Sequence, residues 1–270
     1  MSEHLSISEG SILYLSHGGG PLPLLGDPAH KELADFLRQV PDRLITPSAI
    51  VVISAHWEES KPTVTSGAVP PLIYDYSGFP PDSYEIKYPA TGRPELAGEI
   101  IRLLQQNGID AVLNAERGFD HGMFVPLKQM YPNANIPCVQ LSLVKGLKPE
   151  EHIRLGEPLS ELKKNNVLII GSGFSFHNMR AFFAPPTKDD RDKNEVFEKW
   201  LIETCTSASF NEAERKQRLV DWAKAPAARY CHPREEHLLP LHVCYGAAGT
   251  AARLVYELEI MNKKASMYIW

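Results

Sequence analysis

The chain has 270 residues and carries 28 Lys and Arg against 33 Asp and Glu, a formal net charge of −5. A mildly acidic chain without a basic run is not typical of a nucleic-acid binder that works through phosphate contacts, or of a polybasic membrane anchor. Its longest apolar run, residues 49–55, is far shorter than the roughly 20 residues of a membrane span. Four cysteines without a CxxC pair favour reduced thiols, so we expect a cytoplasmic protein.

Short apolar runs alternate with helical patterns along most of the chain. Three of the runs are apolar on successive residues, which is typical of strands buried on both faces of a parallel sheet. This alternation predicts an α/β fold, a central mostly parallel sheet flanked by helices, in one domain over residues 1–270. The predicted strands are 11–16, 48–55, 137–143 and 167–170, and the predicted helices between them are 28–38, 94–106 and 149–164.

The remaining segments carry different patterns. Residues 62–94 are rich in Pro, Gly and Tyr with weak periodicity, which indicates a long, ordered, functional loop region. Residues 190–228 and 233–248 have helical patterns, and 252–260 and 265–270 are expected to form two antiparallel strands. These two apolar strands are compatible with pairing in a homo-oligomer.

Three histidines follow predicted strands. His17 and His56 come directly after two of them, and His177 lies a few residues after a third. Ligands of open α/β sheets bind at the carboxyl ends of strands, so these imidazoles are expected to converge there. Neutral imidazole is the commonest protein ligand for metals such as zinc and iron, and a catalytic site needs about three protein ligands. We therefore predict a metal site at the carboxyl ends of the strands.

A further ligand is expected from the segment 232–237. His232 and His237 are five residues apart, about 140° around a helix, so they do not easily share one metal. We prefer His237, because it falls within the predicted apolar helix, with Pro233 at the start of that helix.

His121 belongs to the sequence GFDHG, residues 118–122. Asp120 is a good N-cap for a helix that runs towards Met130, and the positive potential there favours neutral imidazole. That suits a hydrogen-bonding or proton-transfer group. The other four histidines are given no role in the site, and two of them, His30 and His152, are expected to be exposed; the four are His4, His30, His152 and His242.

A serine esterase is the rival enzyme class. Residues 17–20 spell HGGG, the oxyanion-hole motif of lipases, and Ser175 lies in a sequence that begins like the nucleophile elbow GxSxG. However, His177 occupies the position of the final glycine, which must allow close packing. This interpretation is therefore the weaker one.

Eight stretches together resemble the class III extradiol ring-cleavage dioxygenases, the branch with DOPA extradiol dioxygenases and the catalytic subunit of protocatechuate 4,5-dioxygenase. The resemblance covers most of the chain, and the stretches are specific jointly; singly, SAHW (54–57) and GFDHG (118–122) carry most of the weight. The stretches are LSHG (15–18), VVISAHW (51–57), YDYSGFP (74–80), YEIKYP (84–89), GFDHG (118–122), IPCVQLSL (136–143), GSGFSFHN (171–178) and EEHLLPL (235–241).

The resemblance implies a non-haem metal, with ferrous iron for oxygenase activity and zinc as a frequent metal after purification. His17, His56 and His237 would be ligands, His177 a further ligand or the base, and His121 a group beside substrate and oxygen. The protocatechuate enzymes use two histidines and a glutamate, so Glu236 is an alternative to His237.

The implied reaction is extradiol cleavage of a catechol, DOPA-like compounds included, by O2. A zinc-dependent hydrolase on the same scaffold is the first alternative, and the serine esterase with Ser175 is the second.

Overall fold

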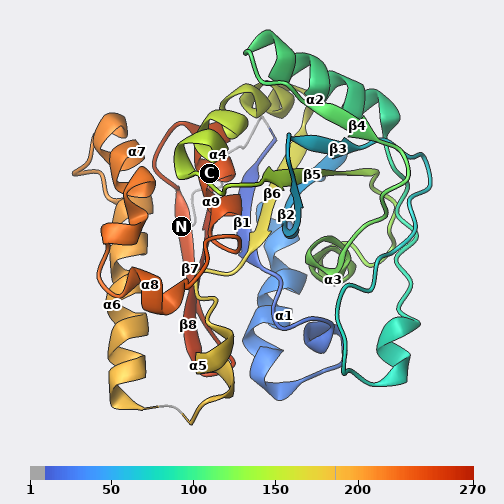
Figure 1. The fold of residues 1–270 in the computed structure, drawn as a ribbon. Helices are drawn as coiled ribbons and strands as arrows, with labels where there is room; N and C mark the ends of the chain where they lie inside the picture. The colour runs from blue at the N-terminus through green and yellow to red at the C-terminus, as the bar shows by residue number, and fades with distance from the viewer. Residues whose placement is uncertain (1–9, 186) are drawn as a thin grey trace, which may run out of the picture.

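The computed structural model describes residues 10–185 and 187–270, which contain one eight-stranded sheet in the order β4-β3-β5-β2-β6-β1-β8-β7 (Figure 1). The strands are β1 Ile12–Ser16, β2 Ala49–Glu59, β3 Thr63–Thr65, β4 Val112–Asn114, β5 Cys138–Val144, β6 Val167–Gly173, β7 Leu254–Ile260 and β8 Lys263–Ile269. The α-helices are α1 Lys31–Gln39, α2 Pro94–Gln106, α3 His121–Met130, α4 Pro149–Gly156, α5 Met179–Phe183, α6 Lys188–Thr206, α7 Glu212–Val220, α8 Ala228–Cys231 and α9 Leu239–Ala248. The 3-10 helices are η1 Leu22–Leu24, η2 Pro28–His30, η3 Val40–Arg43, η4 Pro81–Tyr84, η5 Glu157–Asn165 and η6 Trp222–Lys224.

The four central strands β5, β2, β6 and β1 are parallel, and the antiparallel pairings lie outside them, at β3 with β5 and at β8 with its two neighbours. Every residue of β1 and β6 is buried, as their continuous apolar runs predicted. The predicted α/β class is thus confirmed. The two C-terminal strands form the expected antiparallel pair, with β7 at the edge, and their pairing with a second copy stays a prediction.

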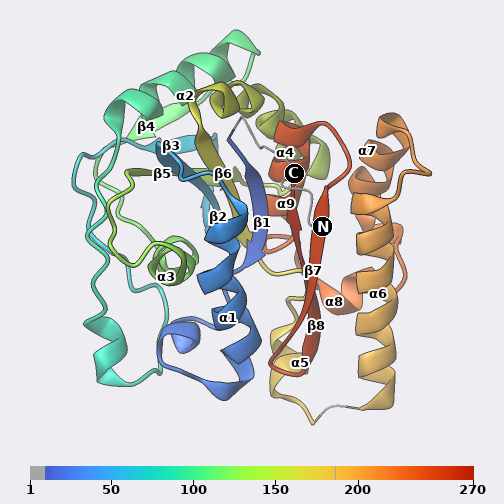
Figure 2. The ribbon, with the colours of Figure 1, turned by 180° about the vertical axis from the view of Figure 1, so that it is seen from behind.

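Helices cover both faces of the sheet. The Ser172 hydroxyl of β6 donates to the Gly122 carbonyl in α3, whereas a Cβ on Gly171 would lie 2.6 Å from the Pro240 carbonyl in α9. Because successive residues of a strand point to opposite faces, α3 and α9 lie on opposite sides of β6. Figure 2 shows α1 beside α3, with α6 at the far side of the molecule.

Two predicted helices are shorter than expected. The helix predicted over 149–164 is α-helical only to Gly156, because Pro158 lacks the N–H of the next intrahelical bond and the chain continues as η5. The helix predicted over 233–248 begins only at Leu239, with Pro240 in its first turn. In the described residues, no helix combines the length and apolar character that crossing a bilayer requires.

Glu198 of α6 is a buried carboxyl group beneath β8. Its Oε2 lies 2.6 Å from the Ser266 hydroxyl, and its Oε1 has no hydrogen-bond partner among the described residues. Burial raises the pKa of Glu198 to about 7, although hydrogen bonds from Ser175 and Ser266 oppose the shift. The folded protein therefore keeps a proton on this carboxyl group that the unfolded chain loses near pH 4.5.

We predict that Glu198 by itself lowers the free energy of unfolding by about 3 kcal/mol between about pH 4.5 and 7, because only the unfolded chain loses this proton in that window. The buried neutral histidines act in the opposite direction, because only the unfolded chain takes up their protons as the pH falls. Glu198→Gln, which keeps a neutral group of the same shape, should remove the Glu198 contribution, so the difference from the wild type should change by about 3 kcal/mol across this window in chemical denaturation. Glu195→Gln is the control, because Glu195 is an exposed partner of Lys264 on the same helix. An equally steep profile in both variants would contradict the assignment.

Candidate active site

The five histidines singled out in the sequence meet at one cavity of about 480 Å³ at the carboxyl ends of the central strands. They come from the residue after β1, from β2, from the start of α3, from the segment after β6 and from the turn before α9. Chain positions 160 residues or more apart are thus brought to one crevice, as the strand-end pattern predicted. The five are His17, His56, His121, His177 and His237.

His17 follows β1, and its ring is buried. Its Nδ1 lies 3.0 Å from the Ser172 hydroxyl of β6, and that hydroxyl donates its proton to the Gly122 carbonyl. Ser172 must therefore accept from His17, so the ring proton is on Nδ1. The unprotonated Nε2 of His17 consequently faces the cavity.

His56 lies inside β2, and not after its end as the sequence predicted. β2 pairs with β6 as far as Ser54, and its register with β5 shifts between Ile53 and Glu58. This β-bulge turns His56 towards the cavity, a common role of bulges next to active sites. The His56 Nε2 lies 2.9 Å from the His17 Nε2.

His237 lies in the turn before α9, so its predicted place within the helix is wrong. The carbonyl of His237 is held by the Tyr14 hydroxyl at 3.0 Å and by the Phe174 N–H at 3.0 Å. A Cβ on Gly173 would lie only 2.0 Å from the same carbonyl oxygen. Glycine at the end of β6 therefore lets the 237 backbone approach the sheet closely enough to reach His17.

Glu236 holds two imidazoles at once. Its Oε1 lies 3.0 Å from the Nδ1 of His237 and 3.0 Å from the Nδ1 of His177, whose rings stack with centroids 3.4 Å apart. Burial raises the pKa of Glu236, but the hydrogen bonds from both rings outweigh it and hold that pKa well below its usual range. An anionic Glu236 therefore accepts from both Nδ1 atoms and leaves both Nε2 atoms without a proton.

Asp75 plays the corresponding part for His121. Its Oδ1 lies 2.9 Å from the His121 Nδ1 and 3.0 Å from the His121 backbone N–H, while its Oδ2 lies 3.6 Å from the His56 Nδ1. Burial raises the pKa of Asp75, but the bonds from His121 hold it below its usual value. The carboxylate favours a proton on each Nδ1 that faces it.

Asp120 precedes α3 as predicted, but its side chain does not cap the helix. It is fully buried and bonded instead to Ser54 at 2.7 Å, to Gln140 at 2.5 Å and to Arg117 at 3.0 Å. Asp120 thus ties the start of α3, and with it His121, to β2 and β5.

Burial, followed by the repulsion of the neighbouring rings, keeps the protein-only site neutral. Burial lowers the pKa of His17 and of His56 well below its usual value, and that of His237 to about 3. Neutral imidazole is the form that binds metals. The possible ligand atoms of His17, His56 and His237 lie within 4.8 Å of one another. The same holds within two further groups, His56 with Asp75 and His121, and His177 with Glu236 and His237.

Ser172 and Asp75 were not identified in the sequence. Ser172 lies in a glycine-rich strand end, and Asp75 lies in the YDYSGFP stretch about 45 residues before its partner in the chain. Their hydrogen bonds join segments that are far apart in the chain, which a local pattern does not report. The expected exposure of His30 and His152 is wrong, because both are buried, and His30 Nε2 accepts from the Gly19 N–H at 2.9 Å. His4 lies outside the described residues.

The rival serine group does not reach the cavity. Ser175 is buried, its hydroxyl accepts from the Ser266 N–H at 2.9 Å, and it is not among the lining residues. The Nε2 of His232 lies 2.6 Å from the Ser175 carbonyl oxygen rather than beside its hydroxyl. The geometry lacks the nucleophile–base contact that serine catalysis requires.

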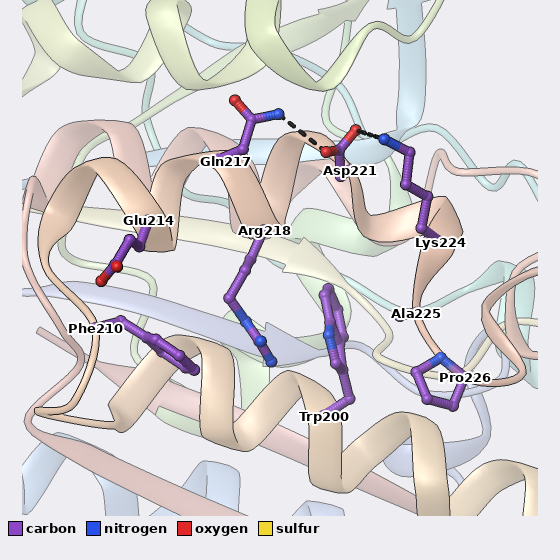
Figure 3. Close-up of a pocket in the computed structure, with 9 residues that line it drawn as sticks. All are labelled: Trp200, Phe210, Glu214, Gln217, Arg218, Asp221, Lys224, Ala225 and Pro226. Atoms are coloured by element: carbon purple, nitrogen blue, oxygen red, sulfur yellow. Dashed lines mark hydrogen bonds and ion pairs between the residues drawn. The ribbon is translucent and has the colours of Figure 1, made fainter.

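A second hollow of about 460 Å³ lies between α6 and α7 (Figure 3). Arg218 lies there with its guanidinium carbon 4.3 Å from the Phe210 ring centroid and 5.5 Å from that of Trp200. Asp221 is paired with Lys224 and also accepts from Gln217. These polar groups already have partners in the protein and do not converge on a point. We therefore expect the catalytic site at the histidine cavity and not in this hollow.

The comparisons with known proteins identify the class. Residues 5–268 match the family described as the catalytic LigB subunit of aromatic ring-opening dioxygenase. The chain is 40% identical over 250 residues to a 4,5-DOPA dioxygenase extradiol of Beta vulgaris, with 90% of each chain covered. It is 39% identical over 274 residues to the dioxygenase tasH of Hapsidospora irregularis, with 96% of this chain and 85% of the relative covered.

A solved structure supports the same fold. The crystal structure of an uncharacterized protein from Escherichia coli K12 matches with a TM-score of 0.74 at 28% identity and covers 96% of this chain and 99% of that one. The chain therefore belongs to the family of the catalytic LigB subunit of aromatic ring-opening dioxygenases. It is an extradiol dioxygenase, and the resemblance drawn from the sequence is confirmed.

We predict that Gly173→Ala destabilises the fold by about 1–3 kcal/mol, because its Cβ would push the His237 backbone away from β6. Gly98→Ala is the matched control: Gly98 lies on an exposed position of α2 with open space around its Cβ. Alanine there should stabilise the helix by about 0.5–1 kcal/mol. Thermal unfolding of both variants checks this, and equal stability of the two would contradict the packing argument.

Proposed function

We propose that the chain is a non-haem metal-dependent extradiol dioxygenase that cleaves a catechol ring with O2, using His17, His56 and His237 as metal ligands. One observation carries the proposal: the Nδ1 atoms of these rings face protein acceptors, so their unprotonated Nε2 atoms are left to the cavity. Metal-binding histidines commonly have their other ring nitrogen held in this way.

The donor set fits a divalent transition metal. Two unprotonated ring nitrogens at 2.9 Å repel each other unless a cation lies between or beside them. Three neutral imidazoles also leave positions open for substrate. Glu236 lies behind His237, on Nδ1, which supports His237 rather than Glu236 as the ligand. When bound, a ferrous ion would supply the Lewis acidity and one-electron chemistry that let an aromatic diol react with dioxygen.

His177 is proposed as the base. Its Nδ1 is held by Glu236, and its ring lines the cavity while remaining about one fifth exposed. Its free Nε2 can therefore take the proton of a catechol hydroxyl, and the Glu236 carboxylate stabilises the imidazolium that forms. The same geometry is compatible with His177 as a further ligand, since it shares a possible metal group with Glu236 and His237.

His121 is proposed as the second catalytic group. Asp75 fixes its ring through Nδ1, and its ring centroid lies 3.9 Å from that of His56 and 5.6 Å from that of Tyr76. A neutral ring held in this way presents Nε2 as an acceptor, and the doubly protonated ring presents it as a donor. His121 can thus exchange a proton with the diol or the reacting oxygen while its position stays fixed.

We further propose that the whole chain is one catalytic domain. The proposed site residues extend from position 17 to position 237 and converge on a single sheet. The four cysteines are free and buried, which supports the proposed cytoplasmic location.

Three imidazoles also suit zinc, which is the metal that we expect in the protein as purified. The alternative of a zinc-dependent hydrolase is not adopted, because the chain belongs to a family of ring-opening dioxygenases. Oxygen consumption separates the two functions, since hydrolysis consumes none.

We expect protein reconstituted anaerobically with Fe²⁺ to consume one O2 per catechol and to give a yellow ring-opened product with both oxygen atoms incorporated. His177→Ala should lower kcat by about 10²–10⁴-fold, since it removes the proposed base. His152→Gln serves as the control for histidine substitution away from the cavity, because the His152 Nε2 accepts from the Val144 N–H and neither residue lines the cavity. An oxygen electrode and product spectra check this, and no uptake with any catechol at full iron occupancy would contradict the proposed function.

A further inference from the structure

The walls of the cavity are apolar, although its floor is made of histidines. Seven apolar side chains from four separate segments line the same cavity as the rings. They are Leu22, Phe79, Phe174, Met179, Phe182, Phe183 and Met261. The cavity volume of about 480 Å³ is in the range that holds a drug-sized ligand, so a one-ring diol on the histidines leaves wall space for a substituent.

No Lys, Arg, Asp or Glu is found among the described residues that line this cavity. The two nearest carboxylates of the site are already bound behind the rings, Asp75 to His121 and Glu236 to His177 and His237. The Tyr76 hydroxyl also has its partner, the Ser83 carbonyl at 2.6 Å. A charged substituent would therefore lose its water without gaining an ion pair, which is costly.

The mouth of the cavity continues the apolar surface. Phe183 is 76% exposed and Met179 is 52% exposed, and both belong to the short α5 that lines the cavity. Phe182 anchors this helix by packing against Phe174, with ring centroids 5.5 Å apart. Large apolar side chains held at a cavity mouth indicate a surface that binds an apolar group.

We propose that the substrate is a catechol with an uncharged apolar substituent, such as an alkyl chain, which extends from the histidines along α5. This inference rests on the proposed function for the cleavage of the ring. The nature of the substituent is inferred only from the apolar, uncharged residues that line the cavity. It separates this chain from its relatives named for DOPA, because the amino-acid end of DOPA carries both an ammonium and a carboxylate group.

The decisive comparison is 4-propylcatechol against L-DOPA, which share a three-carbon side chain and differ in the two charged groups. We expect kcat/KM of the Fe²⁺-loaded enzyme to be at least about tenfold higher for 4-propylcatechol. It should also rise about fourfold for each CH2 from 4-methyl- to 4-propylcatechol, the effect of burying one methylene. Calorimetry under nitrogen on the protein as purified gives the affinities without turnover.

The outcomes separate this inference from the proposed function. Turnover of both catechols with L-DOPA equal or preferred would overturn the apolar substituent and leave the dioxygenase in place. No turnover of either, with tighter binding of 4-propylcatechol, would overturn the dioxygenase and support the apolar site. Absence of both binding and turnover of 4-propylcatechol would overturn the inference.

Variants on α5 test the path of the substituent. Phe183→Arg, at an exposed position that tolerates charge, should lower the ratio of kcat/KM for 4-propylcatechol to that for L-DOPA at least about fivefold. Phe183→Leu should keep the ratio within about twofold. Arg180→Ala is the matched control, because Arg180 is exposed on the same helix and does not line the cavity. A loss of L-DOPA turnover or binding in Arg180→Ala, or an unchanged ratio in Phe183→Arg, would contradict the proposal.

Discussion

The structure depends on the orientation of three imidazole rings. Each ring turns its protonated nitrogen towards the protein and its free nitrogen towards the cavity. Such an arrangement is unfavourable for the protein alone, since the Nε2 atoms of His17 and His56 lie 2.9 Å apart. The fold maintains it through the hydrogen-bond acceptors Ser172 and Glu236 and through the charge of the Asp75 carboxylate, which lies 3.6 Å from the His56 Nδ1. Each acceptor comes from a different segment of the chain, so the site exists only when the whole sheet has formed.

The backbone conformation also helps to position these three rings. The register shift in β2 turns His56 towards the cavity although the strand continues past it, and Gly173 lets the turn before α9 lie directly on β6. Both features shorten the distance between segments that a regular strand and a regular side chain would keep apart. The core around them is conventional: continuous apolar strands buried on both faces by helices.

Much of this could be predicted from the sequence, and the failures have physical causes. The apolar runs identified the central strands, and strand ends identified His17 and His177, because both signals are local. His56 was placed after its strand because a bulge leaves no mark in hydrophobic periodicity. His237 was placed in a helix because Pro233 resembles a helix start, whereas Pro240 occupies the first turn. Asp75 and Ser172 were missed because their partners lie about 45 and 155 residues away in the chain.

The metal content of the protein is the best test of the three-imidazole site. Elemental analysis of the purified protein, before and after loading with Fe²⁺ or Zn²⁺, would be compared with that of a His17→Ala, His56→Ala double variant. A three-imidazole metal site should hold about one metal ion per chain in the wild type and lose that ion in the variant, while circular dichroism shows that the variant keeps its fold. A wild type that binds no metal after loading, or a folded double variant that binds as much as the wild type, would contradict it.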